Sequence, residues 1–252
     1  MQGDLPLLYH THHSRYIEDI PCWCALADRQ GGTLLELGCG GGRVLLALIA
    51  AGHQAFGLDY DRRMLSILKA VSPPELRERL PVFQADMRYF SLKRSFPLIL
   101  MTCNTLSALQ DHERPAVFER IAEHLGPGGV FAASLPNPEI LRTLPSSGDS
   151  ELEDNFPHPV TGNPVQVSSA WSKARNRVEV RWHYDHLYPD GSVERSTASV
   201  AHSLAPIEVY TEELSATGLR IEIAQGDFDG AAYQPDSPHL ILICTRTRPQ
   251  DA

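Results

Sequence analysis

Short apolar segments alternate with amphipathic ones along the first half of the chain. Five-residue segments that are typical of buried strands lie at 33–37, 54–58, 80–84, 97–101 and 130–134. Apolar residues three or four positions apart predict helices over 15–28 and 43–51, and two more that begin at capping residues, one at Asp61 and one running from Asp111 to Leu125. Because strands and helices alternate, we expect an α/β fold with a doubly wound parallel sheet and ligands at the carboxyl ends of its strands.

The pattern changes in the second half. Residues 136–164 contain six prolines and an acidic run, which predicts a Pro-rich acidic loop or flap. Alternating polar and apolar positions then predict three antiparallel strands, at 165–171, 178–188 and 192–204, the last two joined through 189–191. We expect this small sheet to be an insertion that covers one face of a single domain, 1–252, because three strands need a surface to pack against. The remaining segments predict a helix at 211–217 and strands at 219–224 and 240–245 that return to the main sheet.

Composition narrows the possible partners. The 252 residues carry a formal net charge of −9, which disfavours nucleic acid and anionic membranes, since both are bound mainly through lysine and arginine. Five cysteines without paired C-x-x-C spacing predict neither a disulfide framework nor a metal site. The chain starts without a basic region followed by an apolar run, so we expect a cytoplasmic protein that acts on a small molecule.

The glycine-rich segment after the first strand is the most informative stretch. Gly38, Gly40 and Gly42 follow a strand and open a helix, so the backbone can turn sharply and approach a ligand closely. Asp59 ends the next strand, where a carboxylate can accept hydrogen bonds from both hydroxyls of a ribose. These features predict a nucleoside-containing cofactor; the alternative is a structural turn with Asp59 in a helix cap. A dinucleotide fingerprint would have a small residue in place of Arg43.

The run Glu36-Leu37-Gly38-Cys39-Gly40-Gly41-Gly42 resembles motif I of the class I S-adenosylmethionine-dependent methyltransferases. Asp59 is similar to that family's ribose-binding acid, Asp86 and Met87 to its adenine-binding segment, and 125–129 to its turn before strand five. The resemblance implies S-adenosyl-L-methionine as cofactor and a seven-stranded sheet of order 3-2-1-4-5-7-6 with strand 7 antiparallel. The implied cofactor-binding residues are Glu36, Gly38, Gly40, Gly42, Asp59, Tyr60, Asp86, Met87 and Asn104.

A finer resemblance points to the acceptor. Tyr184, the segment 210–214 and the segment 226–230 are similar to the small-molecule branch that includes glycine-type and amino-sugar N-methyltransferases. This branch places an added antiparallel sheet, inserted between strands 5 and 6, over the acceptor pocket. It implies methyl transfer to a small-molecule acceptor, most simply an amine nitrogen, by in-line attack. Asn104 is not followed by the Pro-Pro-Tyr of enzymes that methylate nucleic acid or protein glutamine.

Several residues carry a functional and a structural interpretation. The N-terminal segment 1–30 would form a helical lid in which Tyr9 and Tyr16, with neighbouring histidines, close over the cofactor; equally, these side chains form a solvated face. Asn104 could lie near the reactive methyl group or cap the next turn, and Asp86 could contact adenine or cap a turn. The candidate catalytic residues are Tyr9, Tyr16 and Asn104.

Two other functions are consistent with the same cofactor residues. An NAD(P)-dependent oxidoreductase would share the glycines and Asp59, but it leaves Asp86, Arg43 and the 125–129 turn without a role. A regulator that binds S-adenosylmethionine without transferring its methyl group would keep the whole pocket. Cofactor binding combined with turnover separates these functions.

Overall fold

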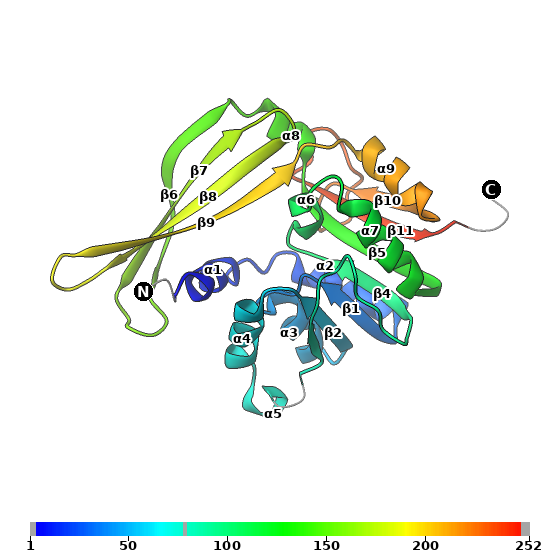
Figure 1. The fold of residues 1–252 in the computed structure, drawn as a ribbon, viewed down its shortest axis with the longest axis horizontal. Helices are drawn as coiled ribbons and strands as arrows, with labels where there is room; N and C mark the ends of the chain where they lie inside the picture. The colour runs from blue at the N-terminus through cyan, green and yellow to red at the C-terminus, as the bar shows by residue number, and fades with distance from the viewer. Residues whose placement is uncertain (1–3, 78–79, 248–252) are drawn as a thin grey trace.

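The structure, a computed structural model, describes residues 4–77 and 80–247 and contains two sheets (Figure 1). The larger sheet has seven strands in the order β10-β11-β5-β4-β1-β2-β3, and β11 runs antiparallel to both of its neighbours. The other neighbouring strands pair in parallel. This arrangement confirms the predicted order and the antiparallel seventh strand. The strands are β1 (Thr33–Leu37), β2 (Gln54–Asp59), β3 (Val82–Gln84), β4 (Phe96–Met101), β5 (Leu125–Pro136), β10 (Leu219–Gln225) and β11 (His239–Arg246).

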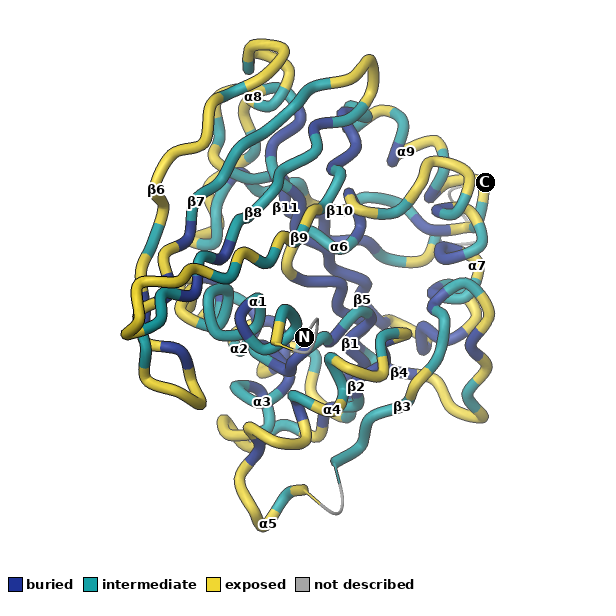
Figure 2. Tube along the Cα trace, turned by 60° about the vertical axis from the view of Figure 1, so that its left-hand side comes forward, coloured by how far each residue is buried: buried dark blue, intermediate teal, exposed yellow. Residues whose placement is uncertain are grey.

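Helices cover both faces of this sheet. Leu35 and Leu37 of β1 pack in one apolar cluster with Phe118, whereas Leu34 packs in a second cluster with Trp23. Because both faces are buried, the central strands read as continuous apolar runs, and buried positions concentrate along them in Figure 2. The helices are α1 (Leu5–His13), α2 (Ile20–Gln30), α3 (Arg43–Ala50), α4 (Arg62–Val71), α5 (Pro74–Arg77), α6 (Thr105–Ala108), α7 (Arg114–His124), α8 (Pro138–Thr143) and α9 (Ile207–Ala216). None of the helices in the described part of the chain is long and apolar enough to cross a membrane.

Two of the predicted helix starts differ from the structure. The helix expected over 15–28 begins at Ile20, with a proline in its first turn, and a separate helix, α1, precedes it. Asp61 caps α4 as predicted, because its carboxylate accepts from the amide of Arg63 at 2.8 Å. Asp111 does not cap α7: Glu113 occupies the cap position, and Asp111 binds the guanidinium of Arg114 instead.

The smaller sheet is antiparallel, in the order β6-β7-β8-β9. Its strands are β6 (Ser147–Pro157), β7 (Pro164–Lys173), β8 (Arg177–Leu187) and β9 (Val193–Ser203). The last three are the strands that the alternation predicts. The prediction of a loop over 136–164 is wrong for most of that segment, because α8 and β6 lie within it. β6 is an edge strand whose residues are mostly exposed, so it shows no apolar alternation.

Helix α1 connects the two sheets. Leu8 is 2% exposed and packs in one apolar cluster with Phe156, Val165 and Tyr184 of the smaller sheet. Figure 1 shows α1 beneath β8 and β9 and above the layer that holds α3 and α4. The N-terminal helix therefore borders the space between the smaller sheet and the carboxyl edge of the larger one.

Candidate cofactor and acceptor site

The glycine-rich turn joins β1 to α3 at the carboxyl edge of the larger sheet. Gly38, Gly40 and Gly42 have φ angles of +74°, +52° and +85°, a region that favours glycine. A Cβ at Gly38 would lie 2.7 Å from Cγ2 of Thr105, so that glycine is needed for packing. At Gly40 the only described atom within 4 Å of such a Cβ is Cε of Met64, at 3.7 Å. Gly40 therefore borders open space that a ligand can enter.

The carboxylate of Asp59 lies directly against this turn. It accepts hydrogen bonds from the amide of Gly40 and the amide of Asp61, each at 2.8 Å. The residue is 8% exposed, and burial raises the pKa of its carboxyl above the ordinary range. The next residue, Tyr60, is 73% exposed. The structure thus brings together the two features that the sequence singled out, the glycines and the acid at the end of β2.

Glu36 lies beneath the same turn and has one oxygen without a donor. It is 1% exposed; Oε1 accepts from the hydroxyl of Thr102 at 2.7 Å, and Oε2 has no hydrogen-bond partner among the described residues. Burial raises the pKa of this carboxyl to about 8. A buried oxygen in this state would gain from a cationic or donor group placed beside it. Glu36 is therefore a candidate contact for a positively charged part of a ligand.

Asp86 and Met87 follow β3 at the same edge. The guanidinium of Arg88 binds the carboxylate of Asp86 through two nitrogens, at 2.5 to 3.0 Å, and the amide of Arg88 also donates to it. This ion pair holds the pKa of Asp86 below its ordinary value. The carboxylate thus has the turn-capping role that was the structural alternative. Met87 is buried, and its Cε would lie 3.5 Å from a Cβ at Gly38.

Two residues after β4 have an unusual backbone conformation. Cys103 and Asn104 have φ angles of +56° and +61°, although neither is glycine. Such strain persists only where the surroundings hold it, and it often marks a functional segment. The thiol of Cys103 accepts from Arg43 at 2.8 Å, and Arg43 also binds the buried Asp19 at 2.5 and 2.7 Å. These contacts fix the segment after β4 against the start of α3.

The N-terminal helix places aromatic side chains over this edge. The ring of His10 lies so close to the glycine turn that a Cβ at Gly41 would be 2.1 Å from its Nδ1. Tyr9 stacks on His13 with ring centroids 4.0 Å apart, and both rings meet Trp182 of β8 edge-on, at 6.0 and 5.0 Å. Burial, with a smaller effect of Cys103, raises the pKa of Tyr9 to about 12.

Tyr16 lies apart from this aromatic group. Its ring lies under the guanidinium of Arg43, 5.4 Å from the centroid, and its edge meets Phe228. Its carbonyl accepts from Arg43 at 2.7 Å. Of the two tyrosines predicted to act in catalysis, the described contacts therefore bring Tyr9, and not Tyr16, against the smaller sheet.

Sequence reasoning missed a row of polar contacts that lies beside Tyr9, His13 and Trp182. His12 lies between two partners: its Nδ1 is 3.2 Å from the hydroxyl of Tyr184, and its Nε2 is 3.4 Å from Oε1 of Glu153. This contact lowers the pKa of Glu153. No signal identified Glu153 in advance, because it lies on the edge strand that was predicted to be a loop.

Comparisons with known proteins agree with this geometry. Residues 34–129 match the family model described as a methyltransferase domain. The chain is 31% identical over 109 residues to a cypemycin N-terminal methyltransferase of Streptomyces sp., a match that covers 43% of each protein. It is 23% identical over 224 residues to a protein of Geobacillus sp. (strain WCH70) named as a methyltransferase, covering 86% of both.

The fold is also shared with a solved structure. The sugar N-methyltransferase KedS8 from Streptoalloteichus sp. ATCC 53650 superposes with a TM-score of 0.76 at 21% identity, covering 98% of this chain and 94% of that one. At this identity the likeness establishes the fold alone. The segment from β1 to the start of β5 therefore matches a methyltransferase domain, and the larger sheet has the fold of the class I S-adenosylmethionine-dependent methyltransferases.

Proposed function

We propose that this chain transfers the methyl group of S-adenosylmethionine to the nitrogen of a small amine, held between α1 and the smaller sheet. Of the similar proteins, one is named a sugar N-methyltransferase and another a cypemycin N-terminal methyltransferase. The observation that carries the proposal is the apolar, aromatic surface that β7, β8 and β9 of the smaller sheet turn toward α1.

The register of the smaller sheet defines this surface. Trp182, which meets Tyr9, lies on the face that packs on α1, and the pairing places Trp171, Val180 and Val200 on the same face. These side chains are only partly exposed. The opposite face carries ion pairs, such as the one between Asp185 and Arg195 at 2.6 Å. An apolar, aromatic wall suits an acceptor that binds without net charge at its reacting atom.

The residues present fit the cofactor. The open space at Gly40 and the carboxylate of Asp59 would hold the adenosine, the turn against the nucleoside and the acid at the ribose. Oε2 of Glu36, which has no partner among the described residues, would accept from the ammonium group. S-Adenosylmethionine supplies a methyl group that is already activated on a sulfonium. The task of the chain is therefore to hold the acceptor atom in line at about 3–3.5 Å and to exclude water.

The titrating groups around the aromatic wall favour a neutral amine. Burial lowers the pKa of His13 to about 4, so its ring is uncharged at neutral pH, and Tyr9 keeps its phenolic proton. A desolvated amine loses its proton more readily than one in water. The side chain of His12, which contacts Tyr184 and Glu153, then offers an acceptor for that proton.

The acceptor wall is tested by comparing two residues on one strand. Trp182→Ala removes an aromatic contact of about 1 kcal/mol, so we expect KM for an amine acceptor to rise about fivefold to tenfold while S-adenosylhomocysteine affinity stays unchanged. His183→Ala, on the opposite face of β8, serves as the matched control and should leave KM unchanged. Equal KM values in both variants would place the acceptor elsewhere.

The reaction itself is tested with labelled S-adenosylmethionine and matched acceptors that differ only in the reacting group: amine, alcohol and carboxylic acid. We expect label transfer to the amine, together with S-adenosylhomocysteine. Transfer to the alcohol or acid alone would overturn the choice of nitrogen. Cofactor binding without turnover on any member of a broad metabolite mixture would instead support a non-catalytic regulator.

The pKa of Glu36 gives a pH-dependent prediction for the same site. At pH 6 and 7 most of the free protein carries Glu36 protonated, since its pKa is about 8, whereas a ligand ammonium favours the ionised form. Binding of S-adenosylhomocysteine should therefore release about one proton at pH 6. Its affinity should fall about tenfold from pH 7 to pH 6, a range in which the ligand's own ammonium stays charged.

Glu36→Gln is the matched variant for this measurement. Calorimetry in buffers of different ionisation enthalpy should show no proton release in the variant and nearly equal affinities at pH 6 and 7. A wild-type protein that binds equally well at both pH values would show that Glu36 does not meet the ammonium group.

A further inference from the structure

A cavity of about 620 Å³ lies at the end of the smaller sheet opposite its β8–β9 hairpin. It is bordered by the β7–β8 turn, the end of β9, the start of α9, and α7 and α8. Four basic side chains line it, Arg114, Arg142, Lys173 and Arg175, against one acidic side chain, Asp111. This local excess of positive charge contrasts with the net charge of −9 of the whole chain.

Two of these cations have no acidic partner in the described structure. Lys173 donates to the carbonyls of Arg142, at 2.7 Å, and Leu144. Arg175 is exposed and makes no hydrogen bond or ion pair with any residue in 4–77 or 80–247. Arg142 is neutralised by Glu139 and also donates to the carbonyl of Leu204. The cavity thus presents about two uncompensated positive charges.

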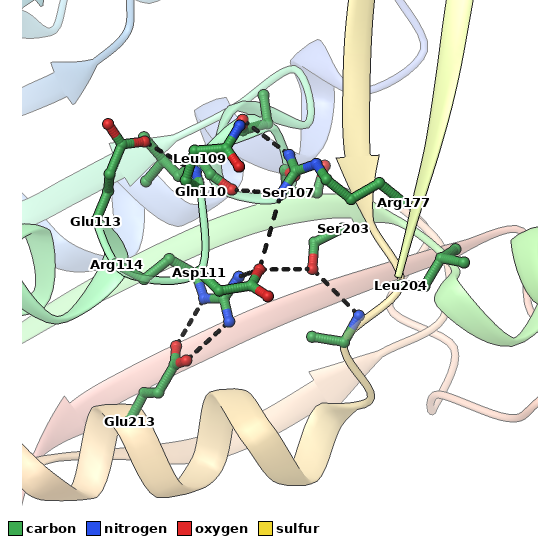
Figure 3. Close-up of polar contacts among 12 residues, drawn as sticks. Ser107, Leu109, Gln110, Asp111, Glu113, Arg114, Arg177, Ser203, Leu204 and Glu213 are labelled. Carbon is green, nitrogen blue, oxygen red and sulfur yellow. Dashed lines mark hydrogen bonds and ion pairs between the residues drawn. The ribbon is translucent and has the colours of Figure 1, made fainter. Parts of the chain in front are cut away.

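The other side of the cavity is a fixed framework of ion pairs (Figure 3). Arg114 is 1% exposed; it binds Glu213 through two nitrogens, at 2.7 and 2.8 Å, and Asp111 at 2.7 Å. Arg177 reaches over from β8 to the carbonyl of Leu109 at 3.0 Å, and Asp111 also accepts from Ser203 at 3.3 Å. These contacts hold the wall in place and leave the charge of Lys173 and Arg175 for a ligand.

We infer that this cavity binds a doubly negative phosphate or pyrophosphate group. Two cations without acidic partners match such a charge, and arginine and lysine are the side chains that bind phosphate oxygens. The volume falls within the range of small-molecule sites. The site is separate from the glycine turn, which binds the adenosine of the proposed function.

The anion has two possible sources, a phosphate that is part of the methyl acceptor or a separate small molecule. Helix α6 lies between the segment after β4 and the cavity: Asn104 precedes the helix, and Asp111, which lines the cavity, follows it by three residues. Four helical residues span about 6 Å. An acceptor with its phosphate in the cavity could therefore extend toward the aromatic wall.

Binding is tested by calorimetric titration of the full chain with sodium pyrophosphate at low ionic strength. We expect saturable binding that Arg175→Glu weakens at least about tenfold, since one attractive charge becomes repulsive. Lys93→Glu makes the same change of net charge at an exposed position outside the cavity and should weaken binding less than about twofold. Unchanged S-adenosylhomocysteine affinity in both variants shows that each is folded.

A second titration separates the two sources, with S-adenosylhomocysteine present. If glucosamine 6-phosphate binds more tightly than pyrophosphate, and glucosamine binds weakly, the anion belongs to the acceptor. If pyrophosphate alone binds, the anion is a separate ligand. Either result supports the site, and neither depends on methyl transfer. The absence of saturable binding by both phosphate compounds, or equal weakening by the two charge reversals, would overturn the inference.

Discussion

Replacing Asp59 with alanine is expected to weaken S-adenosylhomocysteine binding about 100-fold, or by about 3 kcal/mol. The carboxylate lies at the end of β2, where its two oxygens each accept one backbone amide and still have lone pairs for the ribose hydroxyls. Its loss would remove charge-assisted hydrogen bonds to the sugar and also release the amide of Gly40. Calorimetric titration of the purified variant measures the effect.

Asp61 provides the matched control for this experiment. Asp61→Ala removes a neighbouring carboxylate that caps α4, so it should lower stability by about 1 kcal/mol while changing the affinity only slightly. Wild-type affinity in Asp59→Ala would exclude Asp59 as the ribose-binding acid. Equal losses in the two variants would show that the effect comes from the helix start instead.

Replacing Gly40 with valine is expected to abolish cofactor binding, weakening it more than about 1,000-fold, while the chain still folds. Gly40 is left-handed, with φ at +52°, and a side chain there would project into the open space beside the turn. The two methyl groups of valine would occupy the place of the nucleoside. Circular dichroism and a thermal melt check the fold, and titration with S-adenosylhomocysteine checks binding.

Backbone strain alone could lower the affinity of this variant, so a second left-handed glycine is needed for comparison. Gly52, after α3, has a φ of +94°, and no described atom lies within 4 Å of a Cβ there. Gly52→Val should lose similar stability through strain and keep its cofactor affinity. Normal cofactor retention by folded Gly40→Val would refute the placement of the nucleoside against the turn.

Sequence patterns predicted the larger sheet because its central strands are buried on both faces and its helices are amphipathic. Each of these elements carries its own local signal, and the glycine turn adds a backbone requirement that few residue types satisfy. The edge strand β6 lacked such a signal, since its acidic side chains face solvent. Glu113, and not Asp111, occupies the cap position of α7, and Asp111 is instead ion-paired with Arg114.

The candidate site was predictable where one short segment carries the chemistry, and less so where distant segments meet. Gly40 and Asp59 lie 19 residues apart and bond directly, as the spacing after two parallel strands suggests. The contact between Tyr9 and Trp182, by contrast, depends on how α1 packs against the smaller sheet, which no local pattern encodes. The same limit applies to His12 and Glu153, whose pairing needs both α1 and β6 in place.

Helix α1 borders both the proposed cofactor site and the proposed acceptor site. His10 lies on the glycine turn, whereas Leu8 and Tyr9 pack against the smaller sheet. Any motion that frees the spent nucleoside by lifting α1 also takes apart the surface that holds the methylated product. The two products are therefore expected to dissociate together, and the opening of this nine-residue helix is expected to limit the rate of turnover.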